Sequence, residues 1–372
     1  MKFNHFFIIL ILIVSCLPTV NASTQGWLSG WQYRKSHVIN STNGAGTNYQ
    51  VKINVINGTN TDSGDTVYIN NKTRSDFGDV RFTGSDGTTL LDYWMETLNT
   101  GINATFWVEV ADDLSSSNQT IYIYYGKSDA TTTSNGDNTF LFFDDFLGSS
   151  LDTTKWTTYG TPTIAVSNSE IDIQKTGATA GIQTVNSFSQ GRAVRFKFKG
   201  IQGTDHVAEN KIKYDDNNRM DSFYTRYAGA NKYNANTRIG GTWGTETTLY
   251  NAMALNTYYI AEITYINNSL QVKLYDTSYT QLGPTYSSSP SWTPYYVICS
   301  VYSSANLQEG KWDWVFVRKY VSPEPNHGSW GSEETRNWQV TVGNPDISWG
   351  IIFLFFGIIL ALGFTLLTTK KR

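Results

Sequence analysis

The sequence has 372 residues, and its 28 lysines and arginines against 31 aspartates and glutamates give a formal net charge of −3. The cations form no stripe along the chain, which argues against nucleic acid as the partner. Charged residues make up only 16% of the chain and aromatic residues 15%, and apolar residues do not recur at helical spacing between the termini. These features predict an all-β protein.

The N-terminus has the three parts of a secretory signal peptide. Lys2 provides a positive start, residues 6–14 form an uninterrupted apolar stretch, and Val20-Asn21-Ala22 is a small-residue cleavage site. We therefore predict that residues 1–22 are a signal peptide. The string ending at Cys16 offers an alternative, lipoprotein processing, which we rank second because a C-terminal anchor would make a lipid redundant.

Residues 23–140 are predicted to form the first β-sandwich. Ile121, Ile123 and Tyr125 alternate with polar or tyrosine neighbours, as in a strand with one buried face. Five of the six glycosylation sequons outside the predicted signal peptide fall before residue 120, and an exported chain could be modified at such turns. The candidate asparagines are Asn40, Asn57, Asn71, Asn103, Asn118 and Asn267.

Residues 141–333 are predicted to form a second β-sandwich. In the stretch 192–199, one strand face is apolar and carries Val194, Phe196 and Phe198. The other face, which we expect to be exposed to solvent, carries Arg195, Lys197 and Lys199. A hairpin is predicted at Asn267-Asn268, because asparagine tolerates positive φ. Cys299 is the only cysteine left after signal cleavage, so we expect a buried apolar role and no disulfide.

The C-terminus carries the second long apolar run. Residues 334–346 are predicted to be a linker, and residues 347–367 contain no charge and are long enough, at about 1.5 Å per residue, to cross a hydrocarbon core of about 30 Å. The basic tail, residues 368–372, favours a cytoplasmic end. The sequence therefore predicts two antiparallel, jelly-roll-like β-sandwich domains plus one C-terminal transmembrane helix, in a single-pass cell-membrane protein whose bulk is extracellular.

Two stretches resemble known families. Residues 27 to 145 contain WLSGWQYRKSHVIN, DVRFTGSDGTTLLDYWME, ATFWVEVADDL and TIYIYYGK, and they resemble the surface family called domain of unknown function 2341. That resemblance implies an extracellular β module and no reaction. Residues 141 to 333 open with LFFDDFLGSSLDTTKW and close with WDWVFVRKY, and they resemble the concanavalin A-like lectin and glucanase superfamily, including laminin-G-like modules. That resemblance implies that the first and last strands lie together.

The second resemblance raises the hypothesis of a laminarinase-like glycosidase. Such enzymes need paired carboxylates in a Glu-x-Asp-x-x-Glu string. The nearest string here starts with Glu170 and Asp172 but lacks the third acid. No histidine lies at metal-ligand spacing, and no nucleophile turn or phosphate loop occurs. We therefore expect no enzymatic activity and no cofactor.

A structural calcium ion is the one metal that the resemblance suggests. Related sandwiches often hold one beside the last strand, where this chain has Asp313, and Asp144 or Asp145 could add hard oxygen ligands. A capped turn is the alternative interpretation of these aspartates, and we favour it.

Carbohydrate binding is the function that the aromatic content favours. Flat rings stack on the apolar faces of sugars, and the predicted groove contains Tyr224, Arg226, Tyr227 and Trp243. The expected partners are the membrane and either surface glycans or neighbouring envelope proteins. A purely structural envelope component is the alternative, since aromatic residues also favour strands by propensity alone.

Overall fold

The computed structural model describes residues 26–336, and this part of the chain is almost entirely β-structure. Strands form four mostly antiparallel sheets, in which β2 and β3 pair in parallel. The helical segments within the described range are α2 (Gly136–Thr139) and the 3₁₀ turn η1 (Tyr227–Gly229). None of the helices between residues 26 and 336 has the length and apolar character needed to cross a bilayer. The predicted signal peptide and transmembrane segment lie outside the described residues.

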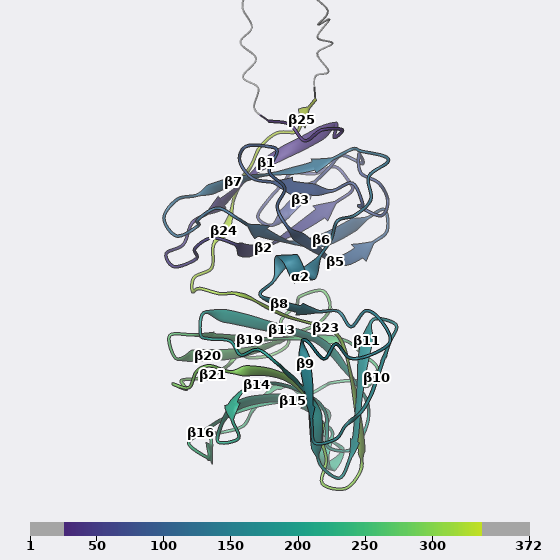
Figure 1. Ribbon diagram of the computed structural model, residues 1–372, viewed down its shortest axis with the longest axis vertical. Coiled ribbons are helices and arrows are strands. Elements are labelled where there is room, and N and C mark those ends of the chain that lie inside the picture. The colour runs from purple at the N-terminus through teal and green to yellow at the C-terminus, as the bar shows by residue number, and fades with distance from the viewer. Residues whose placement is uncertain (1–25, 337–372) are drawn as a thin grey trace, which may run out of the picture. The chain divides into compact units, whose positions relative to one another are not determined.

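The first sandwich pairs two sheets around one apolar core (Figure 1). One sheet has the order β24 (Asn326–Trp330), β1 (Tyr33–Asn40), β7 (Gln119–Tyr125) and β4 (Arg81–Thr83). The other has the order β3 (Thr66–Tyr68), β2 (Tyr49–Ile56), β6 (Asn103–Val110) and β5 (Tyr93–Asn99). Ile121, Ile123 and Tyr125 all point into the core between them as predicted, but β7 is buried on its other face too, since Tyr122 and Tyr124 are 5% and 0% exposed.

The second sandwich is built from two larger sheets. One has the order β10 (Thr163–Ser167), β11 (Glu170–Thr176), β23 (Leu307–Lys319), β13 (Arg192–Gln202), β19 (Tyr259–Ile266), β20 (Ser269–Tyr275) and β21 (Tyr286–Ser288), with β8 (Phe142–Asp144) on β23. The other has the order β17 (Thr242–Trp243), β16 (Lys232–Ile239), β15 (Asn218–Thr225), β14 (His206–Asp215), β22 (Tyr296–Tyr302), β12 (Thr179–Thr184) and β9 (Trp156–Tyr159), with β18 (Thr247–Tyr250) on β16.

Several local predictions for the second sandwich are confirmed. The opening strand β8 pairs with the closing strand β23, with Phe143 opposite Phe316, as the superfamily resemblance implies. Asn267 and Asn268 have φ of 49° and 59° and join β19 to β20, as the hairpin prediction requires. Cys299 is fully buried in the core, where burial raises the pKa of its thiol well above the usual value.

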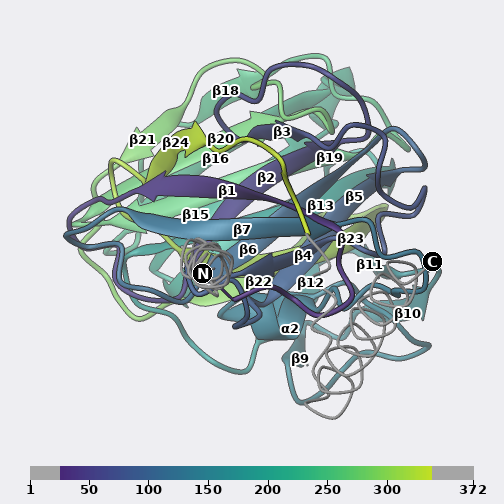
Figure 2. The same ribbon diagram turned by 90° about the horizontal axis from the view of Figure 1, so that it is seen from above.

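The last strands of the described range return to the first sandwich. β24 pairs with β1 in antiparallel register, His37 opposite Trp330 and Asn40 opposite Asn326. Figure 1 shows β24, near the yellow end of the colour scale, among purple and blue strands, and Figure 2 shows β1 beside β7 in the same sheet. β25 (Glu334–Thr335) follows. The predicted boundary at residue 333 is therefore wrong: the second sandwich is inserted into the first, and the stretch predicted as the start of a linker includes a strand.

A β-bulge decides which residues of β23 meet the core. Lys197 lies opposite Trp314 and Phe198 lies opposite Trp312, so Asp313 is an extra residue without a partner on β13. The bulge shifts the alternation by one residue. Trp312 consequently enters the core of the second sandwich, whereas Trp314 and Phe316 join a separate apolar cluster with Trp94 and Trp107 of the first sandwich.

The face of β13 that was predicted to be exposed to solvent is partly buried. Val194, Phe196 and Phe198 occupy the core as expected, but Arg195 is only 8% exposed. Its Nε lies 2.5 Å from Glu262 on the neighbouring strand β19, and Arg318 lies 3.3 Å from the same carboxylate. Burial is possible because the charges are paired: burial alone would raise the pKa of Glu262, but the two guanidinium groups lower it to about 2.

Candidate functional site

The four residues of the predicted glycan groove do not form one site. Tyr224 is completely buried in the core of the second sandwich, so its ring cannot stack on a ligand, and this part of the prediction is corrected. Arg226 and Tyr227 follow the C-terminal end of β15, whereas Trp243 pairs through Arg238 with the start of β15 at Arg219. At about 3.3 Å per residue, the two ends of this strand are about 20 Å apart.

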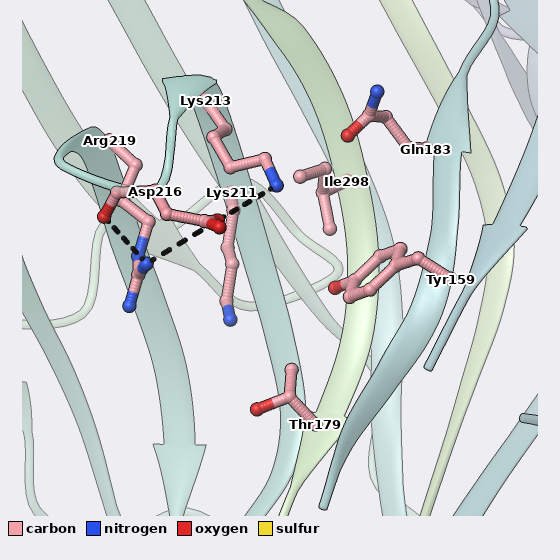
Figure 3. Close-up of a pocket in the computed structure, with 8 residues that line it drawn as sticks. All are labelled: Tyr159, Thr179, Gln183, Lys211, Lys213, Asp216, Arg219 and Ile298. Atoms are coloured by element: carbon pink, nitrogen blue, oxygen red, sulfur yellow. Dashed lines mark hydrogen bonds and ion pairs between the residues drawn. The ribbon is translucent and has the colours of Figure 1, made fainter. Parts of the chain in front are cut away.

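A polar hollow lies instead on the outer face of the sheet that contains β14, at the end of the sheet where β14 turns into β15. Its volume is about 390 Å³. We call it the β14 hollow. Figure 3 shows its lining side chains, which are Tyr159, Thr179, Gln183, Lys211, Lys213, Asp216, Arg219 and Ile298.

Strand alternation explains why charges gather on this face. In β14, Ile212 points into the core and its neighbours Lys211 and Lys213 point outward. In β15, Met220 is a core residue and Arg219 is outward. The register places Lys211 opposite Asp221 and Lys213 opposite Arg219, so four charged side chains lie together on two strands.

Beside the hollow, on the same face of the sheet, lies a buried ionic cluster centred on Glu209. Its Oε2 is 2.6 Å from the Nζ of Lys211 and accepts a hydrogen bond of 2.6 Å from Ser300, while its Oε1 is 2.9 Å from Nδ1 of His206. Asp221 lies 3.8 Å from the same Nζ. Burial alone would raise the pKa of Glu209, but Lys211 and His206 outweigh it and lower the pKa, so this carboxylate stays ionised.

Two aromatic rings border these charges. Tyr159 of β9 lines the hollow, with Lys213 at 5.6 Å from its ring centroid, and burial raises the pKa of its phenol to about 12, so it remains a neutral donor. Trp243 of β17 is 41% exposed, and the guanidinium of Arg219 lies 4.8 Å from its ring centroid. Of the predicted groove residues, Trp243 is thus the one beside the hollow.

One feature of the sequence does point to this site. Glu209, Lys211 and Lys213 occupy alternate positions, so in a strand their side chains lie on one face. The outward face of an exposed sheet usually carries mixed polar residues, whereas here three charged residues follow one another on that face. Their significance depends on neighbours such as Tyr159 and Arg219, which the sequence does not place beside them.

Glu170 and Asp172, the carboxylate pair considered for glycosidase activity, lie on β11, in the other sheet of this sandwich. Lys199 lies 2.5 Å from Glu170, and Lys311 lies 3.5 Å from Asp172. Burial and then Glu309 raise the pKa of Asp172. Both acids are therefore ion-paired with lysines of other strands, β13 and β23.

The calcium hypothesis gains no support from the arrangement of its aspartates. Asp313, the bulge residue, forms an ion pair of 2.6 Å with Lys197. Asp144 accepts hydrogen bonds from the backbone of Phe146 at 2.8 Å and from the indole of Trp156 at 2.6 Å, which is a capping role. Burial raises the pKa of the adjacent Asp145. Within the part of the chain that the structure describes, no three His, Cys, Asp or Glu side chains are grouped so that they could hold a metal ion.

The candidate glycosylation sites differ in accessibility. Asn71, Asn103, Asn118 and Asn267 are exposed. Asn40 and Asn57 are partly buried, and their amides donate to Asn326 and to the backbone of Gly101. Modification at any of these positions stays a prediction.

The fold and the site together define an all-β protein with two antiparallel sandwiches and a polar, charged hollow on the second. The family model for domain of unknown function 2341 matches residues 76–159. The predicted resemblance is thus confirmed for part of its length, since the model match does not include residues 27–75. No match to the chain was found among curated proteins.

Solved structures with detectable similarity include two glucanases. A β-glucanase from Bacillus licheniformis is 14% identical, with 48% of this chain and 97% of that chain covered and a TM-score of 0.38. A β-1,3-glucanase from Mycobacterium marinum is 16% identical, with 48% and 98% covered and a TM-score of 0.34. An uncharacterised protein from Mycobacterium paratuberculosis is 12% identical, with 48% and 100% covered and a TM-score of 0.37. These scores are too low for the likeness to bear on the activity of this chain.

Proposed function

We propose that this chain is a cell-surface protein that binds carbohydrate in the β14 hollow. The observation that carries the proposal is the composition of the hollow: amide, ammonium, guanidinium and phenol groups from four strands face one space of about 390 Å³. Ligand sites are typically concave surfaces with a few convergent polar groups. A saccharide, rich in hydroxyl groups, can use these donors and acceptors together.

The aromatic rings give the same hollow an apolar component. Saccharide rings have apolar C–H faces, and an exposed indole offers a flat surface for them. Trp243 is exposed and is held in place by the guanidinium groups of Arg219 and Arg238, at 4.8 and 5.6 Å from its ring centroid. We therefore assign Trp243 to one edge of the site and Tyr159 to the other.

Glycan screening of residues 23–336, followed by titration of the best ligand, tests this assignment. Trp243→Ala is expected to weaken binding about tenfold, because loss of one stacking contact costs on the order of 1.4 kcal/mol. Tyr227→Ala is the matched control: this tyrosine is 69% exposed and follows the other end of β15. Loss of binding in Tyr227→Ala with none in Trp243→Ala would move the site to the loop after β15.

A catalytic role for the hollow is disfavoured by its electrostatics. Glycoside hydrolysis needs one carboxyl group that is protonated and can serve as an acid. The pKa of Glu209 is lowered, and its two oxygens are occupied by Lys211, Ser300 and His206. Release of reducing sugar from a bound oligosaccharide, abolished by Glu209→Gln, would overturn the assignment as a binding protein. Absence of binding to every glycan would favour the structural envelope role.

The cell-surface part of the proposal depends on the two terminal apolar segments. Residues 6–14 have the character of a signal peptide, and residues 347–367 have that of a membrane span followed by a basic tail. Protease treatment of intact cells is expected to remove both sandwiches and leave a short C-terminal fragment in the membrane. Recovery of the intact chain in the soluble fraction of the cells would contradict this.

A further inference from the structure

The cations of the β14 hollow differ in how their charge is neutralised. Lys211 is 6% exposed, and the buried acids Glu209 and Asp221, which lie beside it on the same face of the sheet, compensate its charge. Lys213 and Arg219 are nearer the solvent, each with a side chain that is 22% exposed, although Nε of Arg219 also lies 3.2 Å from Asp221. Asp221 therefore offsets part of the Arg219 charge, whereas the charge of Lys213 acts on whatever occupies the hollow.

One exposed carboxylate stands between these two outer cations. Asp216 lies on the turn from β14 to β15, its side chain is 81% exposed, and Oδ1 is 3.2 Å from Lys213 and 3.9 Å from Arg219. Figure 3 shows Asp216 between the two cationic side chains. The neighbouring Asp215 is engaged within the turn, where it accepts hydrogen bonds from Asn217 and Asn218.

We infer that the β14 hollow selects saccharides that carry a carboxylate, such as uronic acid residues, and that the ligand carboxylate takes the place of Asp216 between Lys213 and Arg219. This inference rests on the proposed function and names its ligand class. Exposed ion pairs contribute only about 0–1 kcal/mol, so displacing the Asp216 side chain costs little. The hydrogen bonds that Lys213 and Arg219 can donate to the incoming carboxylate are charge-assisted and therefore stronger than neutral ones.

The surrounding groups suit a uronate better than a free small anion. Gln183, Thr179 and the phenol of Tyr159 line the same space and can bond to sugar hydroxyls on the side away from the carboxylate. Trp243, packed on Arg219, offers its ring to the next sugar in a chain. The carboxylate therefore fixes the register of an oligosaccharide whose other groups are recognised nearby.

Matched oligosaccharides test the inference directly. Oligogalacturonate, oligomannuronate and a glucuronate-containing oligosaccharide are each titrated beside their carboxyl-reduced counterparts. We expect at least one acidic form to bind about tenfold or more tightly than its reduced form, and Lys213→Gln to remove most of that difference. The inference is overturned if no acidic form binds more tightly than its neutral counterpart. Tight binding of neutral glycans alone would overturn it while leaving the proposed function intact, and no binding at all would overturn both.

The variant Asp216→Asn tests the inference in the opposite direction, because it should tighten binding. Removing the competing carboxylate is expected to tighten binding of the acidic oligosaccharide about threefold and to leave binding of the reduced form unchanged. Asp137→Asn is the control, because Asp137 is also exposed and ion-paired, with Lys155 at 2.7 Å, but lies on α2 outside the hollow. An equal gain in Asp137→Asn would show that only net charge matters and would contradict displacement of Asp216.

Discussion

A chain that ends at residue 321, before β24, is expected to lose the fold of the first sandwich while keeping that of the second. The truncation removes a strand that pairs with β1, together with Trp330, which packs on the core and stacks on His37 at 3.6 Å. It also removes Glu333, which bonds to Tyr125 and Lys72. Domains have only about 5–15 kcal/mol of stability, and losing an apolar side chain alone costs about 1.5–3 kcal/mol when its burial is complete.

Hydrogen exchange measured by mass spectrometry separates the two sandwiches. In the chain 23–321, peptides from β1, β2, β6 and β7 should exchange as fast as in the unfolded state, whereas those from β14, β15 and β22 should stay protected. The chain 23–336, which retains β24, is the control and should protect both sets. Equal protection of β1 and β7 in the two chains would mean that the first sandwich is complete without its C-terminal strand.

The fold could be predicted where a strand alternates regularly and where a turn is short. The inward residues of β7 and β13 and the Asn267-Asn268 turn follow from local preferences for side-chain burial and positive φ. The return of β24 could not be predicted in this way. Its pairing with β1 joins residues almost three hundred positions apart, and its short sequence, NHGSW, carries no alternation that marks its partner.

The bulge at Asp313 is a second feature that could not be predicted from the sequence. A regular strand would put Trp312, Trp314 and Phe316 on one face, but the extra residue sends Trp312 to one apolar cluster and the other two to another. The burial of Arg195 could not be predicted from the sequence for a related reason. Its burial depends on Glu262 and Arg318, which come from two different neighbouring strands.

Of the residues predicted for the glycan groove, Trp243 lies beside the β14 hollow through its contact with Arg219. Aromatic content led to Tyr224 as well, but strand parity places Tyr224 in the core, on the opposite face from its neighbour Phe223. Parity could have been worked out from Met220 and Ser222, which share the face of Tyr224. The charged residues of the hollow required the register between β14 and β15, which sequence alone does not supply.

Acidification from pH 7 to pH 5 is expected to destabilise the first sandwich through two stacked histidines on β1 and β24. His37 is fully buried, its Nε2 lies 2.8 Å from Nδ1 of His327, and the indole of Trp330 covers its ring at 3.6 Å. Burial, and then the nearby His327, lower the pKa of His37 to about 3. Burial also lowers the pKa of His327, with a further decrease from Lys52 that opposes an increase from Asp65.

The direction of the effect follows from proton binding in the two states. Below pH 6.5 the unfolded histidines bind protons that the folded pair does not, so the unfolded state gains free energy as the pH falls. The stabilising contribution is complete above pH 6.5 and is lost progressively below it, at about 1.4 kcal/mol per pH unit for each histidine that stays neutral in the fold. His37 alone therefore costs about 2 kcal/mol at pH 5.

Urea unfolding of the chain 23–336 at pH 7 and pH 5, followed by hydrogen exchange in β1 and β24, measures this change. The variant His37→Gln/His327→Gln has no imidazole to protonate in this pair, so it should lose most of the difference between the two pH values whatever its absolute stability. The variant His206→Gln, which changes a histidine of the second sandwich, should keep the difference in stability between pH 7 and pH 5. Because the carboxylates titrate mainly below pH 5, an undiminished pH effect in the double variant would mean that the paired imidazoles are not its source.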